Sequence, residues 1–360
     1  MVAQDDIHFM RKALALAERG RGHTSPNPMV GALVVDESGV IVGRGAHQVA
    51  GGPHAEVIAL EEAGERARGA TLYCTLEPCS HTGRTGPCAP LVSASGIRRA
   101  VVALEDPNPL VHGAGLRHLR ERGIETIVGL ERAAAARQNA VFLTNITKKR
   151  PHVTLKVALS VDGRLGLPGV RTPLTGPPAN RRVQRQRAEV DALAVGSSTI
   201  LVDDPLLTPR GVYRSRTLTR IIFDRRLRTP LTAKVLSTLD AGPVIIVTSD
   251  RGVSSVPIRA EKLKDAGARI LALAEEDLGT AMRALGDEGI TSVVVEGGGA
   301  IHQAAFDAGV VDAVHIYIAP RALGTAGMRW IDEGRLDWDM LRDRRATWLG
   351  SDLLVEGDVY

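Results

Sequence analysis

The feature that most constrains the fold is an alternation of short apolar segments with helix-like segments, which runs along the chain twice. Strands that alternate with helices predict a largely parallel sheet covered by helices on both faces. In the first run we expect strands at residues 31–35, 40–45, 70–76, 98–104 and 124–129, and helices at residues 5–18, 54–67, 86–95 and 115–122. In the second run we expect strands within residues 152–163, 190–200, 219–224, 243–249, 268–273, 290–299 and 313–320.

A polar stretch separates the two runs. The segment TNITKKRP, residues 144–151, contains two lysines and ends at a proline, which is typical of a domain boundary. A chain of 360 residues also exceeds the size at which one hydrophobic core usually keeps growing. The sequence therefore predicts two α/β domains in tandem, over residues 1–146 and 147–360.

Composition excludes several classes of protein. Three cysteines are too few, and of the wrong parity, for a disulfide framework. No run of 18 or more apolar residues occurs, and Asp5 and Asp6 stand where a signal peptide would carry positive charge. We therefore expect a cytoplasmic protein without a membrane partner. The net charge of +4 is scattered, and aromatic residues make up only 3%, which argues against a nucleic-acid partner.

Two of the three cysteines lie in one short motif. The stretch TLEPCSHTGRTGPC, residues 75–88, holds Cys79 and Cys88, and PHAEVIAL places His54 and Glu56 at the start of an expected helix. Zinc binds imidazole and thiolate, and a catalytic site keeps three protein ligands and an open fourth position. A nearby carboxylate that is not a ligand can move protons. His-x-Glu followed by Pro-Cys and a second cysteine is a zinc-deaminase signature, so the pattern predicts a catalytic zinc site.

The motif admits other interpretations. A structural zinc site could recruit His81 as a fourth ligand, but it would not need Glu56 two residues from His54. The spacing between the cysteines is longer than in the generic signature, yet loop closure costs rise only slowly with length. We expect His54 and Cys79 to lie near helix starts, whose positive ends favour thiolate. We treat His81 as a pocket residue and Cys74, in mid-strand, as part of the core.

The second half carries two weaker signals. LKVALSVDG alternates two sets of residues, namely Leu155, Val157, Leu159 and Val161 on one face and Lys156, Ala158, Ser160 and Asp162 on the other. An edge strand with a solvated face would produce the same pattern. VVVEGGGAIHQAAFDAG predicts a buried strand, a glycine-rich turn and a helix, whose backbone N–H groups could approach a phosphate. Three successive glycines are not the G-x-G-x-x-G fingerprint, so this signal alone is weak.

Together these motifs resemble a known family. SPNPMVG, HAEVIAL, TLEPCSHTGRTGPC and EDPNP occur in this order, followed by KVALSVDGR and VVVEGGG. They resemble the bifunctional riboflavin-biosynthesis deaminase–reductases over most of the chain, most closely over residues 24–113. The long spacing between Cys79 and Cys88 is the form found in that family.

The resemblance implies both fold and activity. It implies a three-layer cytidine-deaminase-like domain followed by a dihydrofolate-reductase-like α/β domain. The first would use Zn²⁺ to deaminate 2,5-diamino-6-(ribosylamino)pyrimidin-4-one 5′-phosphate by hydrolysis. The second would use NADPH to reduce the ribosyl side chain to ribityl. The implied partner is this phosphorylated pyrimidine, and we expect a homo-oligomer, either a dimer or a tetramer.

The resemblance also implies individual roles. In the first domain, the zinc ligands would be His54, Cys79 and Cys88, the proton shuttle Glu56, and a substrate contact Asn27. In the second domain, the cofactor-binding residues would be Leu159, Thr175, Thr199, Asp203, Gly297, Gly298 and Gly299. The substrate-binding residues there would be Lys156, Asp162, Arg187, Leu207, Arg210 and Glu296. Arginines suit a sugar phosphate, although many arginines are simply surface residues. Asn27, Asp106 and Asn108 are equally explained as turn or loop formers.

Two departures from the family pattern leave an alternative open. Pro173 stands where the family commonly has a tryptophan, and Arg225 stands where it has a serine. The alternative is an active deaminase with an inactive or altered-cofactor reductase-like domain. A binding module merely stapled by zinc, and a deaminase of tRNA or cytidine, are disfavoured by Glu56 and by the attached second domain.

Overall fold

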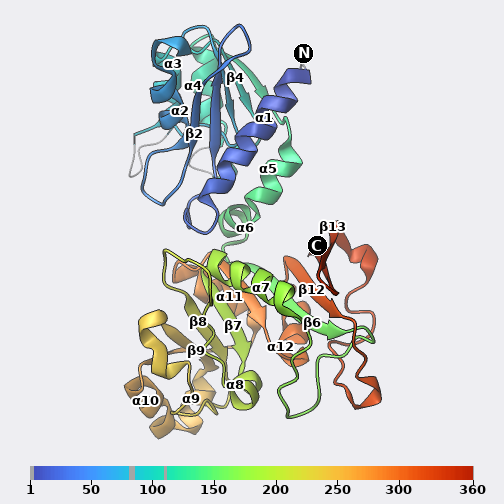
Figure 1. The fold of residues 1–360 in the computed structure, drawn as a ribbon. Coiled ribbons are helices and arrows are strands. Elements are labelled where there is room, and N and C mark those ends of the chain that lie inside the picture. Colours follow the sequence, from blue (N-terminus) through green and yellow to red (C-terminus); the bar gives the residue numbers. More distant parts are fainter. Residues whose placement is uncertain (1–3, 81–85, 109–111, 360) are drawn as a thin grey trace. The chain divides into compact units, whose positions relative to one another are not determined.

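The computed structural model describes residues 4–80, 86–108 and 112–359. The chain divides into two compact units between Lys149 and Arg150 (Figure 1). The expected boundary after residue 146 falls within helix α6 (Ala140–Lys148). The division lies within the polar segment 144–151 but three residues beyond residue 146, because residues 144–148 still belong to this helix.

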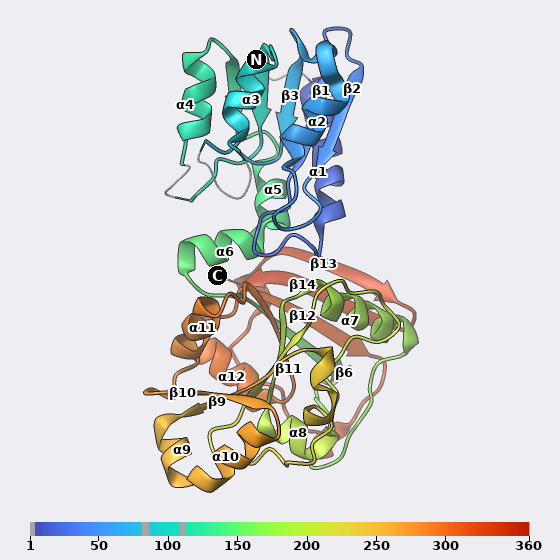
Figure 2. The same cartoon turned by 90° about the vertical axis from the view of Figure 1, so that its left-hand side faces the viewer.

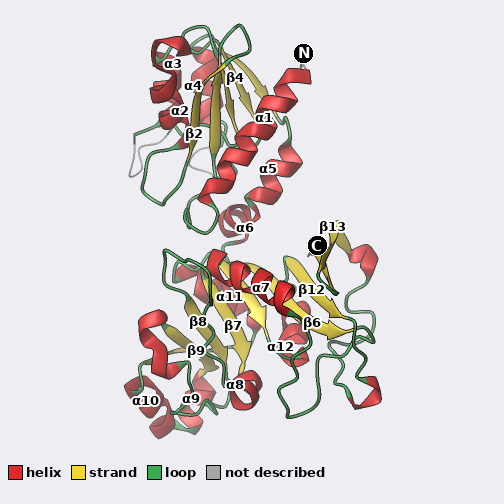
Figure 3. Cartoon of the chain, in the orientation of Figure 1, coloured by secondary structure: helices red, strands yellow, loops and turns green. Residues whose placement is uncertain are grey.

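The first unit is a five-stranded mixed sheet with helices on both faces (Figures 1 and 3). Its strands are β1 (Gly31–Val35), β2 (Ile41–Ala46), β3 (Thr71–Cys74), β4 (Arg99–Val102) and β5 (Glu125–Val128), in the order β2-β1-β3-β4-β5. Its helices are α1 (Gln4–Ala17), α2 (Ala55–Ala63), α3 (Cys88–Ala94), α4 (Ala114–Glu121), α5 (Arg132–Gln138) and α6. Strand β1 is antiparallel to both β2 and β3, whereas β3, β4 and β5 are parallel. Four of these five strands therefore run in one direction, and β1 is the exception to the expected parallel arrangement.

Glycines allow two of these helices to approach opposite faces of the sheet. A Cβ atom on Gly31 of β1 would lie 2.0 Å from the Ala13 carbonyl oxygen of α1. A Cβ atom on Gly45 of β2 would lie 1.8 Å from the Ala55 carbonyl oxygen of α2. Gly45 pairs with Ala32, the neighbour of Gly31, and successive strand residues face opposite sides. Helices α1 and α2 therefore sandwich the sheet, which gives the expected three layers.

The second unit is built on a nine-stranded sheet (Figure 2). Its strands are β6 (His152–Ser160), β7 (Ala192–Gly196), β8 (Thr219–Phe223), β9 (Val244–Ser249), β10 (Ala268–Leu273), β11 (Ser292–Glu296), β12 (Ala313–Ala319), β13 (Leu341–Leu349) and β14 (Asp352–Val359). Its helices are α7 (Pro177–Glu189), α8 (Ser197–Asp203), α9 (Asp250–Ser255), α10 (Pro257–Asp265), α11 (Leu278–Asp287) and α12 (Gly299–Asp307). The strand order is β10-β9-β8-β7-β11-β6-β12-β14-β13. Neighbouring strands are parallel from β10 to β12, whereas β14 is antiparallel to both of its neighbours, β12 and β13.

Strand β6 lies inside this sheet. It pairs with β11 on one side and with β12 on the other, so its interpretation as an edge strand is wrong. The alternating residues of β11 show how the sheet is covered. Val293 and Val295 pack in the cluster that includes residues of α11 and α12, whereas Val294 packs in the cluster that includes α8 and α10.

The chain path predicts a crevice beyond the carboxyl ends of the inner strands β11 and β6. From β6 the chain builds outward through β7, β8, β9 and β10, and then returns to insert β11 between β7 and β6. In open α/β sheets, ligands bind beyond the carboxyl ends of strands where the strand order reverses. Glu296 ends β11 at this place, and Lys156 lies beside it in register on β6. No described helix is both long and apolar enough to span a bilayer.

Candidate active sites

In the first unit, three possible metal ligands converge from separate elements. His54 immediately precedes α2, Cys79 lies in the loop after β3, and Cys88 is the first residue of α3. His54 Nδ1 lies 3.2 Å from Cys88 Sγ and 3.5 Å from Cys79 Sγ. The Cys88 backbone N–H donates to Cys79 Sγ at 3.3 Å. Cys88, and not Cys79, therefore occupies a helix start, which corrects the expectation from the sequence.

The geometry of this triad fits zinc. The three ligand atoms all lie within 4.8 Å of one another. Tetrahedral zinc, with Zn–N near 2.0 Å and Zn–S near 2.3 Å, would separate its ligand atoms by roughly 3.5–3.8 Å. All three cysteines are free, and Cys74 is fully buried in the core, as expected. Within the described residues the triad leaves one tetrahedral position without a protein ligand. His81 lies outside the described residues.

A buried carboxyl group lies beside the triad. Glu56 is the second residue of α2 and is 3% exposed. Burial raises the pKa of Glu56 to about 7, although a hydrogen bond from its own backbone N–H, and to a smaller extent the charge of His54, opposes this. The hydrogen bond from the Cys88 thiol lowers the pKa of Cys79 to about 4, and the same bond with burial raises the pKa of Cys88. Glu56 can therefore hold or release a proton next to the ligand atoms.

Asn27 is held in this site by a residue that no motif revealed. Asn27 Nδ2 lies 3.2 Å from His47 Nε2, and His47 Nδ1 lies 3.0 Å from the Pro53 carbonyl oxygen. Because a carbonyl only accepts, Nδ1 carries the proton and Nε2 accepts from Asn27. The His47 and His54 rings make an edge contact at 5.5 Å between centroids. His47 follows the end of β2, where an isolated histidine gives no spacing signal.

A second residue missed from the sequence is Glu77, within the TLEPC motif. Its buried carboxylate accepts the backbone N–H groups of Asp106, Gly113 and Leu116 at 3.2, 3.0 and 3.2 Å. Asp106 in turn accepts the backbone N–H of Asn108 at 2.8 Å. Glu77 therefore fixes the loop that carries the EDPNP motif, and Asp106 does serve as a loop former. Because its partners lie about thirty to forty residues away, no local pattern could reveal this role.

In the second unit, most of the expected residues line one cavity of about 1090 Å³. The residues that the sequence assigned and that line this cavity are Lys156, Arg187, Thr199, Asp203, Leu207, Arg210, Glu296, Gly297, Gly298 and Gly299. Gly297 has φ +124°, and a Cβ there would lie 2.8 Å from Thr199 Oγ1. The glycine therefore lets the turn after β11 approach the start of α8, which a larger residue would prevent.

Charged groups face one another at the base of this cavity. Arg187 Nε and Nη2 donate to the two Glu296 carboxylate oxygens at 2.8 and 2.7 Å. Burial alone would raise the pKa of Glu296, but the charges of Arg187 and Lys156 lower it to about 2. Burial lowers the pKa of Lys156, whose Nζ lies 5.6 Å from the Tyr317 ring centroid. The cavity thus holds an ionised pair beside an amine that releases its proton more easily than usual.

Three expected residues do not line the cavity. Asp162 lies in the turn after β6, where its carboxylate accepts the backbone N–H groups of Leu323 and Gly324 at 3.1 and 2.7 Å. Thr175 lies just before α7 and bonds Asn180. Leu159 is buried near the end of β6. In this structure Asp162 acts as a loop clamp.

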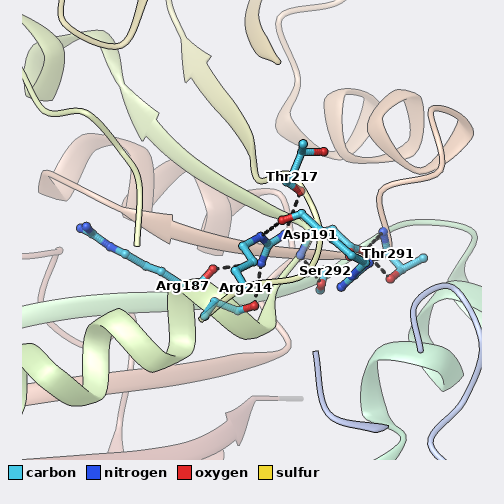
Figure 4. Close-up of polar contacts among 8 residues, drawn as sticks. Arg187, Asp191, Arg214, Thr217, Thr291 and Ser292 are labelled. Atoms are coloured by element: carbon cyan, nitrogen blue, oxygen red, sulfur yellow. Dashed lines mark hydrogen bonds and ion pairs between the residues drawn. The ribbon is translucent and has the colours of Figure 1, made fainter. Parts of the chain in front are cut away.

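Arg187 owes its position to a clamp behind it (Figure 4). The Arg214 guanidinium donates to the carbonyl oxygens of Arg187, Ala188, Arg216 and Thr217. Burial lowers the pKa of Arg214 to about 10. The clamp therefore ties the last turn of α7 to the chain that follows Arg210. In Figure 4 the Arg187 side chain extends away from Arg214.

A second cavity of about 700 Å³ lies beyond the carboxyl ends of β8, β9 and β10. Ser198 and Ala300 line both cavities, so the two adjoin. Arg225, one of the two departures, lines the second cavity and lies 3.4 Å from Glu276. The other, Pro173, is exposed, and its carbonyl accepts from Arg321.

Comparison with known proteins decides the family. The model described as RibD C-terminal domain matches residues 151–355, and the one described as cytidine and deoxycytidylate deaminase zinc-binding region matches residues 3–104. The riboflavin biosynthesis protein RibD of Aquifex aeolicus is 42% identical over 362 residues, covering 99% of each chain. The chain belongs to the RibD family. The RibD protein of Escherichia coli is 40% identical over 89% of each chain.

Solved structures agree with this membership. RibD of Acinetobacter baumannii has 35% identity and a TM-score of 0.86, with 99% of each chain covered. The Thermotoga maritima diaminohydroxyphosphoribosylaminopyrimidine deaminase/5-amino-6-(5-phosphoribosylamino)uracil reductase has 31% identity and a TM-score of 0.86, again with 99% of each chain covered. The chain is thus a bifunctional riboflavin-biosynthesis enzyme with a zinc-dependent deaminase domain and an NADPH-dependent reductase domain, as the resemblance implied.

Proposed function

We propose that residues 1–149 deaminate 2,5-diamino-6-(ribosylamino)pyrimidin-4-one 5′-phosphate and that residues 150–360 reduce the ribosyl group of the product to ribityl. The observation that carries the first assignment is the convergence of His54, Cys79 and Cys88 beside buried Glu56. The Thermotoga maritima relative is named for this pair of activities. Assembly as a homo-oligomer and a cytoplasmic location stay predictions.

The deaminase residues have separate roles in metal binding, proton transfer and substrate contact. His54 Nδ1 and the two cysteine sulfurs would hold zinc, which supplies a Lewis acid that activates water at neutral pH. Glu56 takes one proton from the attacking water and delivers it to the ring nitrogen, and it then passes the second water proton to the departing amino group, because its buried carboxyl lies beside the ligand atoms. Asn27, oriented by His47, contacts the pyrimidine.

The reductase residues bind and orient. When bound, NADPH would supply the hydride that reduces C1′ of the ribosyl group. In this reduction the C1′–O4′ bond opens and one proton is taken up at O4′. Lys156 holds that proton, since it is the amine with a lowered pKa that faces the cavity. Arg187 and Arg210 bind the sugar phosphate, and Glu296 orients Arg187. The cofactor would extend from the Gly297–Gly299 turn toward the arginine-lined second cavity.

This proposal favours an active reductase over the alternative of an inactive one. The C-terminal family model matches residues 151–355, and the ionisable residues implied for the reductase, apart from Asp162, line one cavity. With Pro173 and Arg225 present, Arg187 still pairs with Glu296, and the charge of Lys156 still acts on Glu296. The two departures therefore do not dismantle the site.

The test uses the purified full chain and product masses. Incubation with the diaminopyrimidinone ribosyl phosphate should release ammonia, and the ribityl product should form only when NADPH is added. Glu56→Gln should lower deamination by about a hundredfold or more while retaining zinc, measured by elemental analysis. Glu61→Gln, an exposed residue of the same helix, is the matched control and should change neither.

The reductase is tested separately with the deaminated sugar phosphate. Wild-type protein should oxidise NADPH, and Lys156→Met should lower kcat, whereas Lys262→Met on exposed α10 surface should not. A folded wild type that leaves NADPH unoxidised would contradict the reductase assignment. A Glu56→Gln variant that deaminates at the wild-type rate would contradict the role of Glu56.

A further inference from the structure

One aromatic ring lines the larger cavity, and no motif in the sequence pointed to it. Among the described residues lining this cavity, Trp330 alone carries an aromatic side chain. Trp330 is half-buried. Its backbone oxygen would lie 2.0 Å from a Cβ on Gly299. The turn and Trp330 therefore touch, and glycine at position 299 is what permits that contact.

The indole is fixed by a buried histidine. Trp330 Nε1–H donates to His302 Nδ1 at 2.8 Å, and His302 Nε2 lies 3.1 Å from the Val295 carbonyl oxygen. Since the indole only donates and the carbonyl only accepts, His302 is neutral with its proton on Nε2. Burial lowers the pKa of His302 to about 4, which agrees with a neutral ring. His302 therefore connects the end of β11 to the indole.

The segment around Trp330 is fastened on both sides. Met328 exchanges backbone hydrogen bonds with Gly166 and Leu165 at 2.9 and 3.0 Å. The Asp332 backbone N–H donates to Gln303 of α12 at 3.1 Å. The Phe306 ring packs against the indole at 6.5 Å between centroids. These contacts hold Trp330 in a fixed position in the cavity lining.

We infer that Trp330 is a cofactor-positioning residue of the reductase, whose indole packs against bound NADPH beside the glycine turn, and that His302 is the residue that holds the indole there. The inference rests on the proposed reductase function. A flat, preorganised ring contributes contact area at little entropic cost, which suits a ligand with planar rings and sugars. The neighbouring backbone N–H groups at the start of α12 would donate hydrogen bonds to the cofactor phosphates.

Fluorescence provides a readout that does not depend on turnover. The chain has three tryptophans, and Trp338 and Trp348 are 50% and 70% exposed. In the double variant Trp338→Phe/Trp348→Phe, Trp330 is the sole tryptophan. The probe is NADP⁺, which does not absorb at the emission wavelength of tryptophan, so a change in emission reports contact and not long-range energy transfer. We expect saturating NADP⁺ to quench this emission, and the same titration of Trp330→Phe to show no such change.

Calorimetry measures the strength of the contact. Trp330→Leu should weaken NADP⁺ binding about three- to tenfold, Trp330→Phe should weaken it less, and Trp348→Phe should leave it unchanged. His302→Leu should match Trp330→Leu, and the double variant should be no worse than either, because the two residues act as a unit. His302→Asn keeps an acceptor near the position of Nδ1, so it should restore most of the NADP⁺ binding that His302→Leu loses. That restoration would show that the loss in His302→Leu comes from the missing hydrogen bond and not from misfolding.

The outcomes distinguish a failure of the role of Trp330 from a failure of the proposed reductase function. Wild-type binding of NADP⁺ with unchanged Trp330 emission, or full affinity in Trp330→Leu, would overturn the inference alone. Quenching by the deaminated sugar phosphate without cofactor would overturn it as well, by moving Trp330 to the substrate. A wild type that binds neither NADP⁺ nor NADPH overturns both proposals.

Discussion

Removing Arg187 should destabilise the second unit by an amount that depends on pH. The Arg187 and Glu296 side chains are only 15% and 10% exposed and form two hydrogen bonds at 2.8 and 2.7 Å. Folding lowers the pKa of Glu296 from 4.5 to about 2. A shift of this size corresponds to about 3 kcal/mol of stabilisation near neutral pH. Breaking a buried pair by removing one partner typically costs 3–5 kcal/mol, which agrees.

The sign of the pH dependence follows from the direction of the shift. A carboxyl group whose pKa is lower in the folded state stabilises the fold above its unfolded pKa. That stabilisation is lost as pH falls through the folded pKa, here between pH 4.5 and about 2. We therefore expect Arg187→Met to cost about 3 kcal/mol at pH 7 and only about 1 kcal/mol at pH 3.

Tryptophan fluorescence makes this measurement specific to the second unit. All three tryptophans, Trp330, Trp338 and Trp348, belong to it, so urea unfolding followed by their emission reports that unit alone. Arg185→Met, an exposed arginine on the same helix, is the matched control and should change stability by less than about 0.5 kcal/mol. An equal loss in both variants, or a loss in Arg187→Met that stays constant from pH 7 to pH 3, would refute the reasoning.

Four further predictions follow from the two sites. Gly45→Ala should cost about 1–3 kcal/mol by forcing α2 away from β2, and should lower deaminase but not reductase activity in parallel assays. Glu77→Gln should weaken the hydrogen bonds to the backbone N–H groups of Asp106 and Gly113, and should raise KM for deamination while zinc content stays constant. Cys74→Ala should cost about 1 kcal/mol in urea unfolding and leave zinc content unchanged, because Cys74 is core. The double variant Arg225→Ala/Arg226→Ala should raise KM for NADPH by about tenfold or more and leave KM for NADH unchanged, as expected if these arginines bind the 2′-phosphate.

Much of the site could be predicted because the informative residues cluster in short motifs. His54 and Glu56 stand two residues apart, and Cys79 and Cys88 flank one loop. Their residue types narrow the chemistry to zinc before any fold is known. The strands of the second unit up to β12 were also predicted, since each is a short apolar run between turns. Local pattern suffices where the function depends on neighbouring residues.

The remaining elements depend on partners that are distant in sequence. His47 orients Asn27 from 20 residues away, and Glu77 binds backbone groups 29 to 39 residues away. The hairpin of β13 and β14 was missed because β13 is exposed along nearly its whole length and shows no apolar face. The polar segment 144–148 completes helix α6 because Thr144 is buried, a fact that composition does not reveal.

Two buried glutamates show why a motif names a residue but does not set its chemistry. Glu56 and Glu296 are 3% and 8% exposed, so both carboxyl groups lose most of their hydration. Burial raises the pKa of Glu56 to about 7, whereas the charges of Arg187 and Lys156 lower that of Glu296 to about 2. The difference arises from α7 and β6, which bring two cations to Glu296. One carboxyl can therefore exchange a proton near neutral pH, while the other stays ionised and orients Arg187.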